Sequence, residues 1–210
     1  MQLRGARVNI RPWQRFDEEL ANEWPPYNDP LEPLWNLPRQ LSMSETWSSF
    51  FDMSGQRKSW AVDDYEGRMM GRISLREIDD QKGQARLGIT FGAPYVSRGL
   101  GTEALALFLD GYFFDESQGN YLLMVLDVAA PNERAVRSYQ RLGFSYVGSD
   151  WREAGASFDT RLIELARYRH LRHHFRHTPR GVAVEFFEMQ LSRAEWRARR
   201  RQSPSRAAGG

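Results

Sequence analysis

The sequence predicts a mixed α/β domain built on one β-sheet, and three observations lead to this prediction. Residues 85–92 have the character of a strand, and they run into a turn with two glycines that is followed by helical periodicity. Residues 121–128 are almost wholly apolar, as in a buried strand. A second helical segment opens at Pro131 and ends at Gly143. Strands and helices in this order are typical of a sheet with helices packed against it.

Length and composition favour one domain. The chain has 210 residues, enough for a single core, and the domain is expected to cover residues 1–198. It has no cysteine, which excludes disulfides, thiolate metal sites and a cysteine nucleophile. No window is apolar enough to span a membrane and no secretion signal is visible, so a cytoplasmic location without membrane contact is expected. Residues 199–210 are expected to form a disordered basic tail.

The first part of the chain predicts a strand, a helix and a loop. Residues 6–12 alternate in polarity and end at a proline, as an edge strand does. An acidic helix is expected over residues 16–23. Residues 24–39 combine prolines with large aromatic side chains, which predicts an ordered but irregular loop whose aromatic side chains pack on the core. A capping box at Ser42 then predicts a short helix that ends at Gly55.

The next segments predict a β-meander. Residues 59–64 and 69–77 flank a turn and have the pattern of a β-hairpin, and Gly71 indicates a bulge in its second strand. With the strand before them and residues 85–92 after them, they make four strands in sequential order.

The end of the chain holds an insertion before the last strand. It covers residues 153–181 and is rich in arginine, and it contains all 4 histidines. Apolar residues at spacings of three or four between Leu162 and Phe175 favour an amphipathic helix, whereas residues 178–181 suit a turn between two strands. Both alternatives stay open. Residues 182–191 form the final strand of a mixed sheet of about seven strands flanked by helices.

The turn after residues 85–92 has the features of a phosphate site. A strand, a tight glycine turn and a helix start together point several backbone N–H groups and the positive end of the helix dipole at one place. Two glycines are weak evidence alone, because they are more often plain turn residues. The turn residues are Val96, Ser97, Arg98, Gly99, Leu100, Gly101 and Thr102, and the apolar face of the following helix is Leu105, Phe108, Leu109 and Tyr112.

In this order of parts the sequence resembles the GNAT superfamily of N-acetyltransferases, whose acetyl-CoA loop is followed by a strand, an Asn, and a helix that carries a Tyr before Gly-Phe. The matching residues are Gly99, Gly101, Asn132, Tyr139, Gly143 and Phe144. Residues 101–105 and 132–135 look like the RimJ/RimL-type branch, and the resemblance covers residues 1–196. Val96 departs from the Gln or Arg of the family loop, and Arg86 stands where many relatives carry a Glu.

The resemblance implies a GNAT fold with acetyl-CoA as co-substrate. Two parallel strands are expected to splay around pantetheine, with a backbone N–H of residues 89–91 polarising the acetyl carbonyl. Tyr139 fits the acid that protonates the thiolate, although its spacing alone would make it a core aromatic. Asn132 suits either a pantetheine contact or a helix cap. The expected cofactor-binding residues are Ile89, Thr90, Phe91, Val96, Ser97, Arg98, Gly99, Leu100, Gly101, Thr102, Asn132 and Tyr139.

A general base is harder to identify. Arg86 cannot act as a base, because a guanidinium keeps its proton. Each candidate carboxylate is more typical of a surface or ion-paired acid. We favour Glu185 as the second catalytic residue, since similar proteins often have an acid there. The full set of candidates is Asp127, Glu185, Glu23, Asp29 and Glu32.

The predicted function is transfer of an acetyl group from acetyl-CoA to a primary amine by direct attack, the amine being a protein N-terminus or a small molecule. One alternative is a catalytically weak acyl-CoA-binding or regulatory module, and another is a ribosome- or RNA-associated protein that uses the basic insertion. A net charge of +2 argues against nucleic acid. Arginines beside the histidines argue against a metal. Whether the protein forms a homodimer stays open.

Overall fold

The computed structural model describes residues 1–39, 57–115, 117 and 119–202. Its strands are β1 (Leu3–Arg4), β2 (Asn9–Pro12), β3 (Lys58–Asp63), β4 (Met69–Asp79), β5 (Gln84–Phe91), β6 (Leu123–Ala129), β7 (Ser145–Glu153), β8 (Phe175–Thr178) and β9 (Gly181–Ser192). Its α-helices are α1 (Asp17–Asn22), α3 (Leu100–Phe114), α4 (Glu133–Leu142) and α5 (Arg193–Gln202). Its 3₁₀ helices are η1 (Glu32–Leu34), η2 (Ala93–Tyr95), η4 (Thr160–Glu164) and η5 (Ala166–His174).

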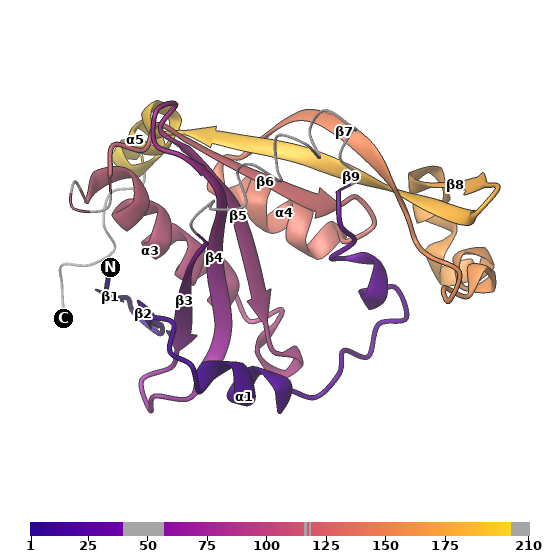
Figure 1. Ribbon diagram of the computed structural model, residues 1–210, viewed down its shortest axis with the longest axis horizontal. Coiled ribbons are helices and arrows are strands. Elements are labelled where there is room, and N and C mark those ends of the chain that lie inside the picture. The colour runs from indigo at the N-terminus through magenta and orange to yellow at the C-terminus, as the bar shows by residue number, and fades with distance from the viewer. Residues whose placement is uncertain (40–56, 116, 118, 203–210) are drawn as a thin grey trace.

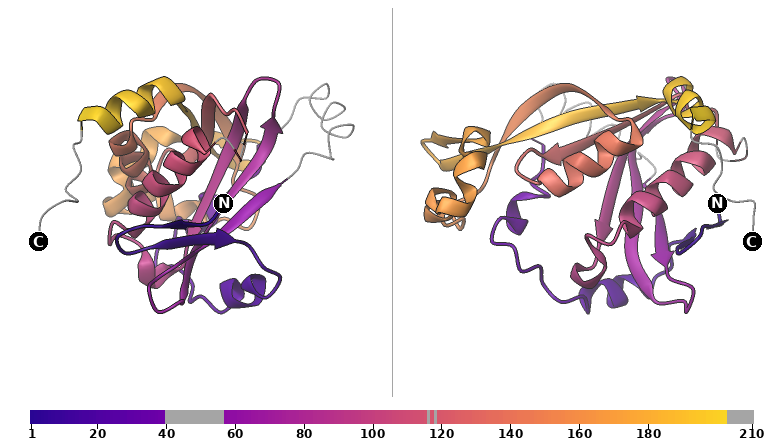
Figure 2. Two further views of the ribbon diagram at one scale, coloured as in Figure 1. Left: turned by 90° about the vertical axis from the view of Figure 1, so that its left-hand side faces the viewer. Right: turned by 180° about the vertical axis from the view of Figure 1, so that it is seen from behind.

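A single mixed sheet organises the described part of the chain. Its strand order is β1-β2-β3-β4-β5-β6-β9-β7, and β8 pairs with β9. All neighbours are antiparallel except β5 and β6, which are parallel. Helices α3 and α4 lie together on one face of the sheet (Figures 1 and 2). The predicted fold class is confirmed, and the short strand β1 is an addition to the expected strands.

The helix after the glycine turn packs as its periodicity predicted. Leu105, Phe108, Leu109 and Tyr112 are all buried against the sheet. The Tyr112 hydroxyl donates to the backbone oxygen of Leu123 at 2.8 Å, which ties α3 to β6. This attachment fixes the direction of α3, so that its N-terminal turn borders the gap between the two parallel strands.

The parallel strands β5 and β6 separate before they end. Their register runs from Gln84 opposite Leu123 to Leu87 opposite Leu126, yet β5 continues to Phe91 and β6 to Ala129. Figure 1 shows the two strands diverging beyond the paired positions. The splay implied by the resemblance is therefore present, and it opens a passage between the two faces of the sheet.

The bulge expected in the second strand of the hairpin is present, but it lies one residue from the expected position. The register between β3 and β4 passes from Val62 opposite Gly71 to Asp63 opposite Met69, so the extra residue is Met70, next to the expected Gly71. A Cβ at Gly71 would lie 2.7 Å from the Thr90 oxygen, so close strand approach requires the glycine there.

The insertion forms 3₁₀ helices in place of the expected amphipathic α-helix. Its apolar residues Leu162, Leu165, Tyr168 and Leu171 are spaced by three, which is the period of a 3₁₀ helix. The chain then enters β8, which pairs with β9, so the alternative of a turn between two strands is correct for the end of the insertion. Strands β7 and β9 carry this segment to the end of the molecule opposite α5 (Figure 1).

The expected domain boundary at residue 198 falls inside a helix. Helix α5 continues to Gln202, and it is anchored by buried Trp196, whose Nε1 donates to Asp110 at 2.9 Å. The helix expected between Ser42 and Gly55 and the segment 203–210 lie outside the described residues. Among the described helices, none combines the length and the apolar character needed to cross a membrane.

Candidate active site

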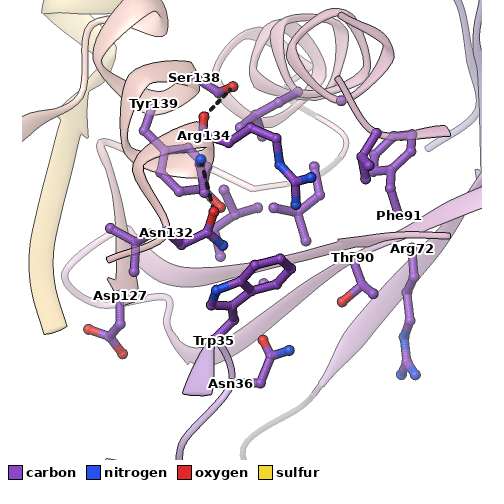
Figure 3. A pocket seen from close by; sticks show the side chains of 18 of the residues that line it. Trp35, Asn36, Arg72, Thr90, Phe91, Asp127, Asn132, Arg134, Ser138 and Tyr139 are labelled. Carbon is purple, nitrogen blue, oxygen red and sulfur yellow. Dashed lines mark hydrogen bonds between the residues drawn. The ribbon is translucent and has the colours of Figure 1, made fainter. Parts of the chain in front are cut away.

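A cleft of about 570 Å³ occupies the gap between β5 and β6. One end is bordered by the glycine turn and helix α4, on the face of the sheet that carries the helices. The other end is bordered by the segment 24–39 and by side chains on the opposite face of the sheet. Figure 3 shows Phe91 and Tyr139 on one side of the strands, and Arg72, Thr90 and Asp127 projecting to the other side. We call the end next to the glycine turn and α4 the helix end of the cleft, and the end next to the segment 24–39 the loop end.

The glycine turn has the backbone expected of an anion cradle. Gly99 has a φ of 78°, in the left-handed region that favours glycine, and it precedes the first turn of α3. A Cβ added at Gly101 would meet only the Phe91 ring, at an ordinary 3.5 Å, so no protein neighbour requires a glycine there. The open space in front of Gly101 faces the cleft. The turn residues that line the cleft are Val96, Ser97, Gly99, Gly101 and Thr102.

Arg98 and Leu100, which we expected to bind cofactor, do not line the cleft. The Arg98 side chain is exposed, and its backbone oxygen accepts from Arg7 Nη1 at 3.2 Å. The backbone N–H and Nε of Arg7 donate to Glu103 in the first turn of α3, at 2.6 and 2.7 Å. Arg7 therefore holds the turn in place from outside the cleft.

Strand β5 presents backbone donors to the cleft. Gly92 donates its N–H to Met70 in β4 at 2.9 Å, and because strands alternate with period two, the N–H groups of Ile89 and Phe91 point away from β4 toward the gap. The Phe91 oxygen faces the same way, since it accepts a hydrogen bond from the Tyr27 hydroxyl of the loop segment. The expected residues Ile89, Thr90 and Phe91 all line the cleft.

Helix α4 brings two expected residues to the helix end. Asn132 caps the helix, its Oδ1 accepting from the Ala135 N–H at 3.3 Å, and it also lines the cleft. Tyr139 is 9% exposed and packs its ring against Phe144. Burial raises the pKa of the Tyr139 hydroxyl, and nearby Arg134 offsets only part of this rise. Within the described residues the hydroxyl has no protein hydrogen-bond partner, so it is available to a ligand.

At the loop end, Asp127 is enclosed by arginines. Its carboxylate, 5% exposed, accepts from Arg86 at 2.6 Å and lies 3.3 Å from both Arg76 and Arg152. The Arg86 guanidinium has two further partners, Glu77 at 2.7 Å and Glu188 at 3.0 Å. Burial alone would lower the pKa of Arg86, but these carboxylates outweigh burial and raise it. Asp127 is thus a structural counter-charge and a poor base.

Comparison with known proteins agrees with this architecture. Residues 7–145 match the family profile of the acetyltransferase (GNAT) domain. The chain belongs to the GNAT acetyltransferases. A spermidine N(1)-acetyltransferase of Escherichia coli strain K12 is 25% identical to this acetyltransferase over 143 residues, which are 67% of this chain and 74% of that protein.

Solved GNAT structures share the fold of this acetyltransferase. Spermidine N-acetyltransferase from Vibrio cholerae, in complex with CoA and spermine, superposes with a TM-score of 0.60 at 16% identity, covering 90% of this chain and 97% of that one. The GNAT-family acetyltransferase from Bacillus anthracis gives a TM-score of 0.59 at 14% identity, covering 93% of this chain and 100% of that one.

The acetyltransferase does not bring the expected base Glu185 to its cleft. Phe186 lines the cleft whereas Glu185 does not, and the Glu185 side chain lies on the face of β9 opposite to Phe186. The Glu185 carboxylate instead lies 2.8 Å from His174 Nδ1. Of the other candidate bases, Asp127 and Glu32 line the cleft, whereas Glu23 and Asp29 do not. The described residues contain no group of three or more side chains arranged to hold a metal ion.

Sequence reasoning missed the arginines of helix α4. Arg134, Arg137 and Arg141 all line the cleft, and their spacing by three and four places them on one stripe of the helix. This spacing was visible in the sequence and is the signal that would have found them. Arg134 also lies over the rings of Trp35 and Tyr27, at 5.2 and 5.7 Å from their centroids, so it connects α4 to the loop segment.

Proposed function

We propose that this acetyltransferase moves the acetyl group of acetyl-CoA to a primary amine by direct attack. The observation that carries the proposal is the cleft between β5 and β6, which runs from the glycine turn at one end to the loop segment at the other. Two substrates that approach from opposite faces of the sheet would meet in this gap. With no cysteine in the chain, no thiol is available to form an acyl-enzyme.

The helix end suits acetyl-CoA, which supplies an activated thioester when bound. Gly99 and Gly101 at the start of α3 allow backbone N–H groups to approach a pyrophosphate, and Thr102 adds a hydroxyl from the first helical turn. Arg137 and Arg141 present guanidinium groups that match phosphate oxygens. The space beside Gly101 that no protein atom fills supports the same assignment.

Three groups of the chain have chemical roles in this proposal. The N–H groups of Ile89 and Phe91 polarise the acetyl carbonyl and stabilise the charge that develops on its oxygen. The Tyr139 hydroxyl donates its proton to the departing sulfur. These groups lie in the cleft, and the hydroxyl is the end of Tyr139 that has no protein partner.

Glu32 replaces Glu185 as our candidate for the group that accepts the proton of the amine, directly or through water. It lines the loop end, and among the described carboxylates that line the cleft it is the one without an arginine partner. A free carboxylate can accept a proton, whereas Asp127 would have to give up three guanidinium contacts.

The proposal also places the protein in the RimJ/RimL-type branch, which residues 101–105 and 132–135 support. Its acceptor is then either a protein N-terminus or a small-molecule amine. A module that binds acyl-CoA without catalysis is the competing function, because Val96 departs from the family loop.

The test combines binding with turnover. Calorimetry should show acetyl-CoA binding to the wild-type protein, and a panel of primary amines should release free thiol from acetyl-CoA. Gly101→Val should weaken acetyl-CoA binding by about tenfold or more, because the side chain fills the space proposed for pyrophosphate. Gly148→Val is the matched control, since a Cβ there meets no atom within 4 Å and Gly148 does not line the cleft.

Two results would contradict the proposal. Unchanged acetyl-CoA affinity in a folded Gly101→Val protein would remove the cofactor from the glycine turn. Acetyl-CoA binding without thiol release from any amine would favour the binding module over the enzyme.

A further inference from the structure

Arginines outnumber carboxylates among the residues that line the loop end of the cleft. Arg72 and Arg76 of β4 stand opposite Thr90 and Arg86 of β5, which places them on the sheet face that also carries Asp127. Figure 3 shows Arg72 and Asp127 projecting to this side. The arginines that line the loop end are Arg57, Arg72, Arg76 and Arg152.

The carboxylates of this face are already engaged. Asp127 is shared by three guanidinium groups. Asp150 pairs with Arg152 at 3.0 Å, and both Glu77 and Glu188 pair with Arg86. Within the described part of the cleft, Glu32 is left as the unpaired acid. Glu32 can interact with the amine that reacts. A second ammonium group on the same acceptor would lie next to guanidinium groups.

Arg72 and Arg76 are partly open to solvent, with 30% and 40% of their side chains exposed. Their Nε atoms lack a hydrogen-bond partner in the described structure, but these atoms are buried, so a ligand would have to use the exposed part of each side chain. Arg72 contacts Ser59 Oγ at 3.1 Å and Glu18 at 3.4 Å, and the Asp127 contact of Arg76 is 3.3 Å, longer than a strong charge-assisted bond. Burial lowers the pKa of Arg76, Asp127 offsets part of this, and the neighbouring Arg86 and Arg152 lower it further. The partial exposure and the long carboxylate contacts of both side chains, together with the unfavourable charge surroundings of Arg76, favour an added anion.

We infer that the acceptor is a primary amine that also carries a carboxylate, which Arg72 and Arg76 bind while its amine enters the gap between β5 and β6. The same charges disfavour polyamines, in contrast to the relatives named as spermidine acetyltransferases. This inference rests on the proposed function, because it names the acceptor class of that site. A free amino acid and the N-terminus of an acidic peptide share the required chemistry.

Three amines with the same carbon chain test the charge preference. They are γ-aminobutyrate, butylamine and putrescine, which carry an anionic group, a methyl group and a second ammonium at the far end. We expect kcat/KM for γ-aminobutyrate to exceed that for putrescine by about tenfold or more, as expected for one charge-assisted contact. Calorimetry with CoA present should give the same order of affinity. Glycyl-aspartate compared with γ-aminobutyrate distinguishes a peptide N-terminus from a free amino acid.

Arginine variants assign the preference to its residues. Arg72→Gln and Arg76→Gln should each lower the ratio of kcat/KM for γ-aminobutyrate to that for butylamine by about tenfold. The double variant Arg72→Glu, Arg76→Glu should invert the order of γ-aminobutyrate and putrescine. Arg68→Gln is the control, because this side chain is 64% exposed and does not line the cleft. Added salt should weaken γ-aminobutyrate binding, since dissolved ions screen charges over a Debye length of about 10 Å at 0.1 M.

The outcomes separate the inference from the proposed function. Putrescine bound and acetylated as well as γ-aminobutyrate would overturn the inference and leave the enzyme assignment intact. A ratio that is unchanged in Arg72→Gln and Arg76→Gln would also overturn it. If no amine were acetylated, the proposed function would fail, and the calorimetric order of the three amines would still decide the charge preference.

Discussion

At the scale of single residues, Tyr139 is the group that we propose as the proton donor to the departing sulfur. Tyr139→Phe keeps the ring that packs against Phe144, so acetyl-CoA affinity should hold while kcat falls by about 10²-fold. Because burial raises the pKa of Tyr139, the hydroxyl keeps its proton past the ordinary phenol pKa of about 10. Wild-type kcat should therefore show no loss from this group up to that pH. Steady-state kinetics across pH and calorimetry measure both effects.

Tyr146→Phe provides the control for this variant. Tyr146 is exposed, and its ring contacts Phe187 and does not line the cleft, so removing its hydroxyl should leave kcat unchanged. Thermal melting should first show that both proteins are folded. Undiminished turnover in Tyr139→Phe would mean that the thiolate is protonated by another group.

Residue identity could be predicted from the sequence more readily than residue partners. Tyr139 and the glycines were found because their neighbours along the chain form a recognisable pattern. The sequence shows Arg86 only as a departure from the family pattern. Its ion-pair partners could not be identified, since Asp127 and Glu188 are 41 and 102 positions away along the chain. Glu185 was misplaced because a single position along β9 decides which face of the sheet a side chain joins.

At the scale of elements, the junction of β5 and β6 depends on the Asp127 carboxylate. Asp127→Asn removes the negative charge that three arginines share next to the last paired residues of the two strands. The free energy of unfolding should fall by about 3 kcal/mol, as when one partner of a buried ion pair is removed. Denaturant titration measures the change. The acceptor KM should also rise, because the divergence of the strands shapes the cleft.

Glu66→Gln is the matched control, since Glu66 pairs with Arg68 on the exposed surface and such pairs contribute little. Equal stability of the Asp127→Asn and wild-type proteins would show that the arginines find other partners and that the junction does not depend on this charge.

The elements that the sequence predicted best are those with a long repeating pattern. Helices α3 and α4 and the strands around the glycine turn follow clear periods of burial. Strands β1 and β8 are too short to produce such a pattern. In the insertion, a spacing of three residues fits either an α-helix or a 3₁₀ helix, because periods of 3.6 and 3.0 residues per turn are hard to tell apart over so short a segment.

At the scale of the whole molecule, a second apolar cluster connects the insertion to the loop end of the cleft. Leu31 and Leu34 of the loop segment pack in one cluster with Ile163, Leu171 and Phe175 of the insertion. Trp35, which lines the cleft, packs against the edge of this cluster. The insertion therefore supports the loop segment through this shared apolar cluster.

Two arginines of the insertion have partners near it in the structure. Arg172 donates to Glu164 at 2.5 Å, and Arg176 lies over the Trp151 ring at 4.3 Å. Neither lines the cleft, and Arg169 does not line it either. An effect of the insertion on the acceptor would thus pass through apolar packing more than through charge, which the composition of the segment alone does not reveal.

Ile163→Ala tests this route from the insertion to the acceptor. The variant leaves a cavity in the apolar cluster that also contains Leu31 and Leu34, which should destabilise the protein by about 2–5 kcal/mol and let the loop segment shift. We expect the acceptor KM to rise about tenfold, because small displacements of positioning groups have large kinetic effects. Acetyl-CoA affinity should stay unchanged, since Ile163 lies outside the helix end of the cleft.

Ile10→Ala makes the same change in the other core. Ile10 is fully buried in β2 and belongs to the cluster beneath the helices, not to the one that supports the loop segment. The Ile10→Ala protein should show a comparable fall in the free energy of unfolding, measured by denaturant titration, while its acceptor KM stays at the wild-type value. Equal rises of the acceptor KM in both variants would attribute the effect to general loosening of the fold. A rise confined to Ile163→Ala would identify the insertion as the support of the acceptor pocket.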